Sequence, residues 1–256
     1  NNATLDHSGT GELIFASNLS VGGNTKTLTL TGSTAGIGEI AGVISAGSGT
    51  TSLAKDGSGT WRLTAANTYA GSTTVRNGTL VLTGANGAIT ASSGFTVNHG
   101  ATLRLENSAS ANNGNRLRDA SNVTLNGGTL HFANDGGAVS FSESAATLTI
   151  AQNACTVRSD RAGAGQTSTL TFSALSRTAG AAVNFTGEAL GDLDGRNTIK
   201  ITGQAEGLIG PWATVNGTHL AAYSTARGVY ASPEPAYDAD IAARGPSSVI
   251  LDNPAA

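Results

Sequence analysis

The sequence predicts an all-β protein whose short strands are wound into a parallel β-helix, also called a β-solenoid. Short runs with an apolar residue at every second position recur along the chain. Between the runs stand Gly, Asn, Ser and Asp, which accept tight turns and positive φ. Similar strand–turn–strand segments return at intervals in the twenties, which is a period typical of stacked solenoid coils.

The alternating runs place one row of side chains inside the protein and the next row outside. The clearest runs are 26–31, 59–64, 79–83, 101–105, 123–125, 147–150, 169–172 and 198–202. The outward row is mostly Thr, whose branched Cβ suits a pleated strand and whose hydroxyl tolerates water without adding charge. No stretch of ten or more residues has convincing helical spacing.

Three strand–turn–strand segments resemble one another: 74–82, 96–105 and 123–132. Their turn glycines, Gly78, Gly100 and Gly128, are 22 and 28 residues apart. In a parallel β-helix the same coil position recurs one rung higher, so like residues are expected to stack. A run of Asn-Gly hairpins in an antiparallel β-sandwich is the alternative fold. With roughly ten coils at about 4.8 Å each, the solenoid would be about 50 Å long.

Composition limits the function classes. Only 12% of the 256 residues are charged, and the net charge is 14 − 17 = −3. Clustered Lys and Arg are therefore lacking, which argues against a nucleic-acid partner. No run of about 18 apolar residues is present, so we expect no membrane insertion by this segment. The chain has one Cys, which excludes an internal disulfide, and no Met, which indicates a piece without its initiator residue.

Residues 49–82 resemble the autotransporter-associated β-strand repeat, or passenger-associated transport repeat. The matching positions, with their spacing kept, are Leu53, Lys55, Gly57, Gly59, Thr60, Leu63, Ala66, Asn67, Tyr69, Gly71, Thr73, Val75, Gly78, Thr79 and Leu80. The resemblance implies an exported bacterial protein with a right-handed parallel β-helix, often one module of a longer chain. It implies no catalytic residues.

The residues of this repeat also have a physical interpretation. Gly57 and Gly59 bracket a corner, and Asn67 is expected to bond the backbone of a neighbouring rung. Trp61 and Tyr69 are predicted to pack in the core and at a corner rather than to form a sugar-stacking platform. The side chains expected to point inward are those of Trp61, Leu63, Val75, Leu80 and Leu82.

The densest candidate for chemistry is the segment 188–197. Asp192 and Asp194 are two apart and would face one side of a strand, with Asn197 near enough to help hold Ca²⁺. A solvated turn is the favoured interpretation, and a calcium site or a catalytic carboxylate pair are the alternatives. We therefore assign no catalytic, metal or cofactor-binding residue and expect no cofactor.

The remaining reactive side chains are isolated in the sequence. His7, His99, His131 and His219 form no local metal motif, and His99 and His131 are expected at the surface. Cys155 lies in an apolar strand and is predicted to be a buried small hydrophobe. The cluster 158–161 is predicted to be a solvated turn containing an ion pair.

Two regions are predicted: a solenoid body at 1–230 and a Pro-rich tail at 231–256 with a terminal strand at 247–251. The terminal strand either caps its own solenoid or adds to a neighbouring copy.

The predicted function is structural, in an extracellular bacterial surface layer, adhesin stalk or filament, and the protein is not expected to be an enzyme. Its expected partners are a second copy of itself or a longer parent chain. The alternatives are a module that binds surface glycans through exposed aromatic residues such as Tyr69, Trp212 or Tyr230, and a polysaccharide-active β-helix enzyme.

Overall fold

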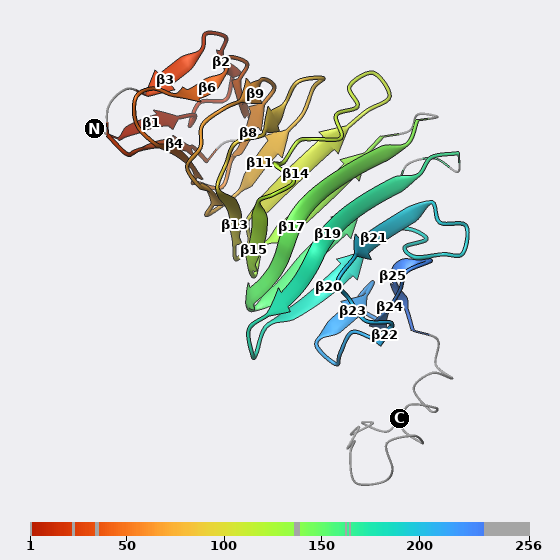
Figure 1. Ribbon diagram of the computed structural model, residues 1–256. Helices are drawn as coiled ribbons and strands as arrows, with labels where there is room; N and C mark the ends of the chain where they lie inside the picture. Colours follow the sequence, from red (N-terminus) through yellow and green to blue (C-terminus); the bar gives the residue numbers. More distant parts are fainter. Residues whose placement is uncertain are drawn as a thin grey trace.

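The computed structural model describes residues 2–21, 24–33, 36–135, 139–161, 163 and 165–232. Every regular element in these ranges is a strand, and the strands stack as parallel coils along an elongated body (Figure 1). This confirms the β-solenoid and excludes an antiparallel sandwich for the body. Within the same ranges we find no helix with the length and apolar character needed to cross a bilayer.

The first sheet forms one side of every coil, and all its neighbouring strands are parallel. In spatial order it contains β1 (Ala3–Asp6), β4 (Lys26–Thr31), β7 (Thr51–Lys55), β10 (Thr73–Val75), β13 (Gly94–Asn98), β15 (Asn122–Asn126), β17 (Phe141–Gln152), β19 (Ser168–Arg177) and β21 (Asn197–Ile201). Nine strands make 9 − 1 = 8 steps between rungs. The expected ten coils are therefore too many, because the later coils use more residues each.

The second sheet forms the opposite side. Its parallel strands are β2 (Leu13–Phe15), β5 (Ile37–Ile40), β8 (Thr60–Leu63), β11 (Thr79–Leu82), β14 (Thr102–Asn107), β16 (Thr129–Asn134), β18 (Ala154–Ser159), β20 (Ala182–Thr186) and β23 (Ala213–Val215). Three antiparallel strands complete it: β24 (His219–Ser224), β22 (Gly207–Leu208) and β25 (Gly228–Ala231). β25 packs against β21. These strands cover the last rung, and the terminal strand predicted at 247–251 lies outside the described residues.

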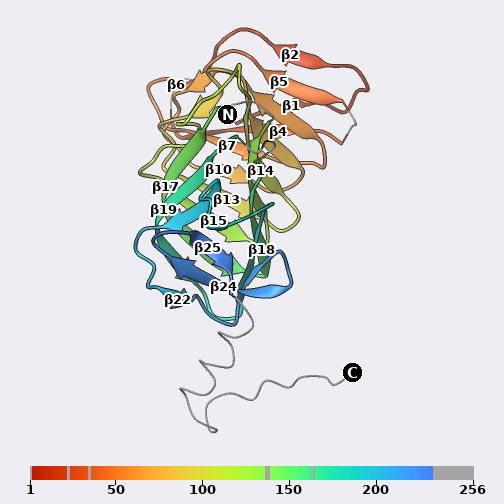
Figure 2. The same cartoon turned by 90° about the vertical axis from the view of Figure 1, so that its right-hand side faces the viewer.

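A third side exists only in the N-terminal half. It is built from β3 (Leu19–Val21), β6 (Ile44–Ala46), β9 (Ala66–Asn67) and β12 (Ala88–Ile89), and it ends where Ile89 bridges to Leu117. From β17 onward the coil has two sides, and β17 and β19 lengthen to 12 and 10 residues before β21 returns to 5. Figure 2, turned from the view of Figure 1, shows the long β17 and β19 together with the short β6.

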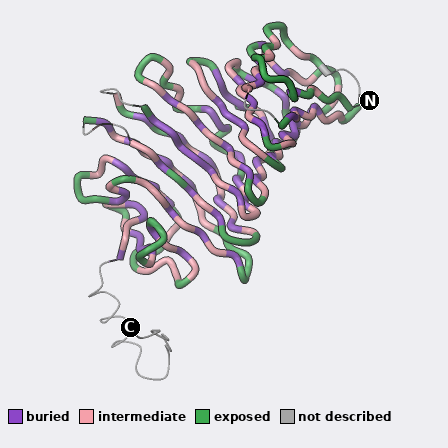
Figure 3. Tube along the Cα trace, turned by 180° about the vertical axis from the view of Figure 1, so that it is seen from behind, coloured by how far each residue is buried: buried purple, intermediate pink, exposed green. Residues whose placement is uncertain are grey.

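The register places like residues on one another, as the recurrence predicted. Thr79 pairs with Thr102, which pairs with Thr129, and this outward row is half-buried. Buried and less buried positions alternate along most strands (Figure 3). One detail differs from the expectation: the glycine with positive φ in the third segment is Gly127, at +87°, and not Gly128.

The inward row of the repeat segment is confirmed. The five side chains predicted to point inward, Trp61, Leu63, Val75, Leu80 and Leu82, are each exposed by 1% or less.

Candidate functional site

The glycine corner after β7 encloses the amino group of Lys55, which is fully buried. Its Nζ donates to the carbonyl oxygens of Asp56, Gly57 and Asn77 at 2.6, 2.8 and 3.0 Å. Burial lowers the pKa of Lys55 to about 8, opposed by the nearby Asp56 carboxylate. Gly57 has φ +67°, and a Cβ there would lie 2.4 Å from the carbonyl oxygen of Gly32. The three ammonium donors of Lys55 thus bind two rungs together.

Asn67 performs a similar task on the third side of the coil. Its Oδ1 accepts a bond from the amide of Ile44 at 2.9 Å, one rung earlier. Its Nδ2 donates to the carbonyl of Ala65 at 2.8 Å and to that of Ala88, one rung later, at 3.0 Å. Asn67 is fully buried, and the predicted bonding between rungs is confirmed.

Two aromatic side chains complete the interior of this segment. The Trp61 indole is buried, and its Nε1 donates to the carbonyl of Thr31 at 2.9 Å. Tyr69 is fully buried, and its hydroxyl lies 2.8 Å from Oγ1 of Thr73, which lies 3.1 Å from Oγ of Ser92. Burial raises the pKa of Tyr69, opposed by the bond to Thr73. Core packing is confirmed for both, and the suggestion that Tyr69 is an exposed glycan-binding residue is wrong.

Lys55, Asn67 and Tyr69 fall within one short stretch of the chain. Residues 53–82 match the passenger-associated-transport-repeat family. This transport repeat runs from β7 to β11 and so spans slightly more than one coil. No curated protein and no solved structure matches the chain.

A network of charged side chains extends along the outer face of the second sheet, on the rungs that follow the transport repeat. Nη2 of Arg104 lies 3.0 Å from Oε1 of Glu106, and its Nη1 lies 3.2 Å from Nδ1 of His131. On the next rung, Oδ2 of Asp160 lies 2.7 Å from Nε2 of His131. Oδ1 of Asp160 accepts a bond of 2.8 Å from Nε of Arg158. Five side chains on three rungs are therefore linked.

The protonation within this network follows from its geometry. Arg104 can only donate, so Nδ1 of His131 accepts and Nε2 donates to Asp160. Burial alone would raise the pKa of Asp160, but the bonds from His131 and Arg158 outweigh it and lower the pKa to about 2. Both ring nitrogens of His131 are engaged by side chains of this network.

Two expectations change here. His131 is only 7% exposed, so its predicted surface position is wrong, because Arg104 and Asp160 enclose the ring. Arg158 and Ser159 belong to β18 and not to a turn, while the predicted ion pair in this cluster is confirmed between Arg158 and Asp160.

A second polar cluster lies where the third side ends. Glu143 in β17 is 1% exposed, and its carboxylate accepts bonds from the amides of Arg116 and Leu117 at 2.8 and 3.2 Å. These amides would otherwise face a strand of the next rung. Burial raises the pKa of Glu143 to about 7, opposed by the backbone amides and by the Arg116 charge.

The guanidinium of Arg116 occupies the same junction and is fully buried. It donates to four oxygens at 2.6 to 3.1 Å: the carbonyls of Gly84, Gly87 and Ala111, and Oδ1 of Asn107. No role was expected for Arg116 or Glu143 from the sequence. A signal was available for Glu143, because it occupies an inward position of the alternating run Phe141–Ala145 in a chain with few charges.

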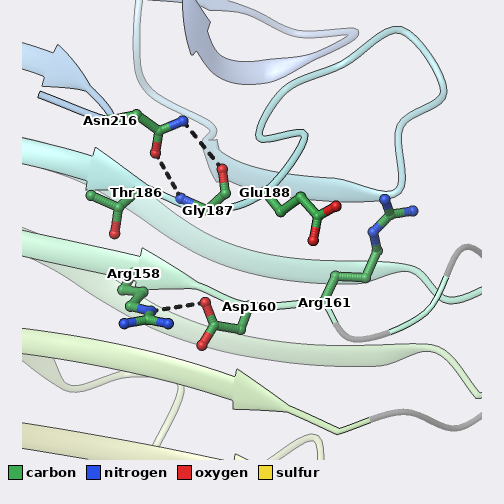
Figure 4. Close-up of a pocket in the computed structure, with 7 residues that line it drawn as sticks. All are labelled: Arg158, Asp160, Arg161, Thr186, Gly187, Glu188 and Asn216. Atoms are coloured by element: carbon green, nitrogen blue, oxygen red, sulfur yellow. Dashed lines mark hydrogen bonds and ion pairs between the residues drawn. The ribbon is translucent and has the colours of Figure 1, made fainter. Parts of the chain in front are cut away.

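A groove of about 670 Å³ lies over the ends of β18, β20 and β23 (Figure 4). Its lining residues are Arg158, Asp160, Arg161, Thr186, Gly187, Glu188 and Asn216, and we call it the β18–β23 groove. Asn216 accepts a bond from the amide of Gly187 at 3.1 Å and donates to its carbonyl at 3.3 Å, extending the strand ladder with a side chain. The groove therefore has a hydrogen-bonded floor and charged walls.

Asp192, Asp194 and Asn197, the candidate calcium ligands, do not come together in the structure. Asp192 and Asp194 are exposed in a turn, and Asp194 pairs with Arg196 at 3.3 Å. Asn197 is buried instead, and its amide bonds the backbone of Ser159 and Glu188. Among the described residues, no group of three or more His, Cys, Asp and Glu side chains could hold a metal ion.

The other reactive groups are spread over the body. Cys155 is buried as predicted, and its Sγ accepts a bond from the amide of Gly127 at 3.3 Å. Burial raises the pKa of its thiol, opposed by backbone hydrogen bonds. His99 and His219 are exposed, and His7 is buried.

The two remaining aromatic candidates for glycan binding are each covered by a cation. The guanidinium carbon of Arg177 lies 5.0 Å from the ring centre of Trp212, and that of Arg227 lies 4.1 Å from the ring centre of Tyr230. Both aromatic side chains are also half-buried. One face of each ring is therefore occupied within the chain itself.

Proposed function

We propose that this chain is a structural stalk segment of a bacterial passenger protein, secreted or displayed at the cell surface. The transport repeat and the β-solenoid fit a passenger-like structural role. The main support for this proposal is that the polar residues of the repeat make structural hydrogen bonds inside the fold. Lys55, Asn67 and Tyr69 are all buried, and their donors and acceptors bond neighbouring rungs or core hydroxyls.

A solenoid built in this way has a simple mechanical function. Each coil contacts mainly its neighbours, so the body acts as a stiff spacer whose length is set by the number of coils. The outward rows of Thr keep its two faces hydrated with few charges. An adhesin stalk and a filament subunit both need a stiff spacer of this kind. The stacked coils also suit end-to-end contact with a longer parent chain or with a second copy of this chain.

Deletion of one whole coil tests the structural role. Val75 pairs with Val97, so removing residues 75–96 joins Thr74 to Val97 and excises one complete coil in register. In cells that export the native protein, we expect this variant to fold and to reach the surface, with the stalk about 4.8 Å shorter. The measurements are immunolabelling of intact cells and circular dichroism of the purified chain.

Deletion of residues 75–85 is the matched control, because half a coil breaks the register and is expected to prevent folding. A whole-coil variant that fails to fold or to reach the surface, as the half-coil variant does, would contradict a structural role in which coils are interchangeable spacers. If antibodies label the protein only after the cells are lysed, the proposed location outside the cell is wrong.

A further inference from the structure

The β18–β23 groove has the size and lining of a binding site for a small polar ligand. Its volume of about 670 Å³ falls within the range of ligand sites in proteins. Six of its seven lining residues have polar or charged side chains, and they come from three consecutive rungs. A sugar-sized molecule rich in hydroxyl groups fits such a lining better than an apolar one.

One wall of the groove carries hydrogen-bond donors without an acceptor. Nε and Nη1 of Arg161 are shielded from solvent, and among the described residues neither has a hydrogen-bond partner. Unpaired buried donors destabilise the conformation that shields them. Rotation of the guanidinium toward the open groove would let a ligand carboxylate accept bonds from these donors.

Arg158 supplies a second set of donors beside it. Only its Nε is engaged by Asp160, and its side chain is 52% exposed. A guanidinium presents donors in a planar fork that matches a carboxylate. Both oxygens of Asp160 already accept bonds from His131 and Arg158, and the charge of its carboxylate is balanced by Arg158.

The remaining wall accepts hydrogen bonds. Glu188 lies across the groove from Arg158 and on the same side as Arg161 (Figure 4). Its carboxylate can accept bonds from sugar hydroxyls, and the hydroxyl of Thr186 can donate or accept. The groove therefore combines a cationic part with an acceptor part, which is what a sugar with a carboxylate group requires.

We propose that the β18–β23 groove binds an acidic sugar, with its carboxylate on Arg158 and Arg161 and its hydroxyls on Glu188 and Thr186. This goes beyond the stalk function and is independent of it. A stalk that carries such a groove would contact uronic-acid units of surface or environmental polysaccharides.

Titration of the full chain with galacturonate and with galactose tests the proposal, since the two sugars differ in the carboxylate. Binding is followed by NMR shifts of the ligand-contacting amides or by calorimetry. We expect galacturonate to bind at least tenfold more tightly than galactose and than acetate or inorganic phosphate. Equal binding of galactose, equal binding of acetate or phosphate, or no saturable binding of galacturonate would each overturn the acidic-sugar assignment.

Variants locate the binding in the groove. Arg161→Gln is expected to weaken galacturonate binding at least tenfold, and Arg158→Lys, which keeps the charge but loses the fork, to weaken it severalfold. Arg76→Gln is the matched control on the first-sheet side, where Arg76 forms an exposed pair with Asp56 at 3.7 Å, and it is expected to bind normally. Circular dichroism checks folding, and Arg158→Lys decides the test if Arg161→Gln does not fold. Unchanged binding in the folded groove variants would overturn the proposal.

Discussion

The three-sided coils of the N-terminal half and the two-sided coils of the C-terminal half solve the same packing problem differently. In the three-sided half a coil step takes 22 residues from Val75 to Val97, whereas in the two-sided half it takes 29 from Leu170 to Ile199. The three-sided coil closes its corners with buried polar side chains such as Asn67. The two-sided coil also buries polar side chains, such as Asn197, and its interior contains the large side chains of Phe141, Phe172 and Phe185.

The junction between the halves shows what such a change requires. When the third side stops, the amides of Arg116 and Leu117 lose the strand that would pair with them. A buried carboxylate on the next rung replaces that strand, and a buried guanidinium satisfies nearby carbonyls. A change of coil shape within a continuous solenoid therefore depends on two charged residues that satisfy free backbone groups.

The largest expected effect comes from removing the carboxylate at this junction. Glu143→Leu leaves two buried amides without acceptors and Arg116 without a compensating charge. We expect a loss of about 3–5 kcal/mol in the free energy of unfolding, measured by urea denaturation.

Glu106→Leu is the control, because Glu106 forms a partly exposed pair with Arg104 on the outer face. Its loss is expected to cost less than about 1 kcal/mol. Equal losses for the two variants would show that the junction has no special role.

The second-largest expected effect is a pH dependence of the free energy of unfolding that arises from Glu143 at the junction. The pKa of Glu143 is raised from 4.5 to about 7, so the folded protein holds this proton more tightly than the unfolded chain. Its contribution to stability is therefore fully present below pH 4.5 and is lost as pH rises through 7. At 1.4 kcal/mol per pKa unit the expected change is about 3 kcal/mol.

Denaturation of the native chain and of Glu143→Gln between pH 4 and 8 measures this contribution by difference. We expect the native chain to lose more stability across this interval than the Gln variant, whose side chain does not titrate. Parallel curves for the two proteins would place the titration elsewhere.

A third prediction compares Asn residues from the two halves. Asn67→Ala removes three hydrogen bonds, two of them buried, and leaves their partners unpaired, with an expected cost of about 2–3 kcal/mol. Asn184→Ala in the two-sided half removes partly exposed contacts to Thr214 and Gly217, with an expected cost below about 1 kcal/mol. Thermal melting of both variants checks the order, and a costlier Asn184 change would contradict the importance assigned to the bonds of Asn67 between rungs.

The smallest expected effect concerns the exposed turn of the two-sided half. The double change Asp192→Asn and Asp194→Asn is expected to shift stability by less than about 0.5 kcal/mol, since the aspartates lie in solvent. Melting temperatures with and without added Ca²⁺ are expected to be the same for native and variant proteins. A calcium-dependent rise in the native protein alone would restore the calcium hypothesis.

Local patterns were sufficient to predict the strands, their parallel stacking and the interior of the transport repeat. Alternation in runs such as 79–83 specifies which side chains face inward, and the match of 74–82 with 96–105 specifies what stacks on what. The position of His131 could not be predicted in this way, because its burial depends on Arg104 and Asp160 from neighbouring rungs. The β18–β23 groove was missed for the same reason, since residues from 158 to 216 meet there only after coiling.

The sequence by itself determined the strand alternation, the glycine corners and the spacing of the repeat, because each depends on the preferences of residues close together in the chain. Only the tertiary structure decided that the third side stops at Leu117, that antiparallel strands cover the last described rung, and that Arg116 and Glu143 are buried together. Those features arise between rungs, where side chains some 25 residues apart complete each other's hydrogen bonds and no local pattern records the pairing.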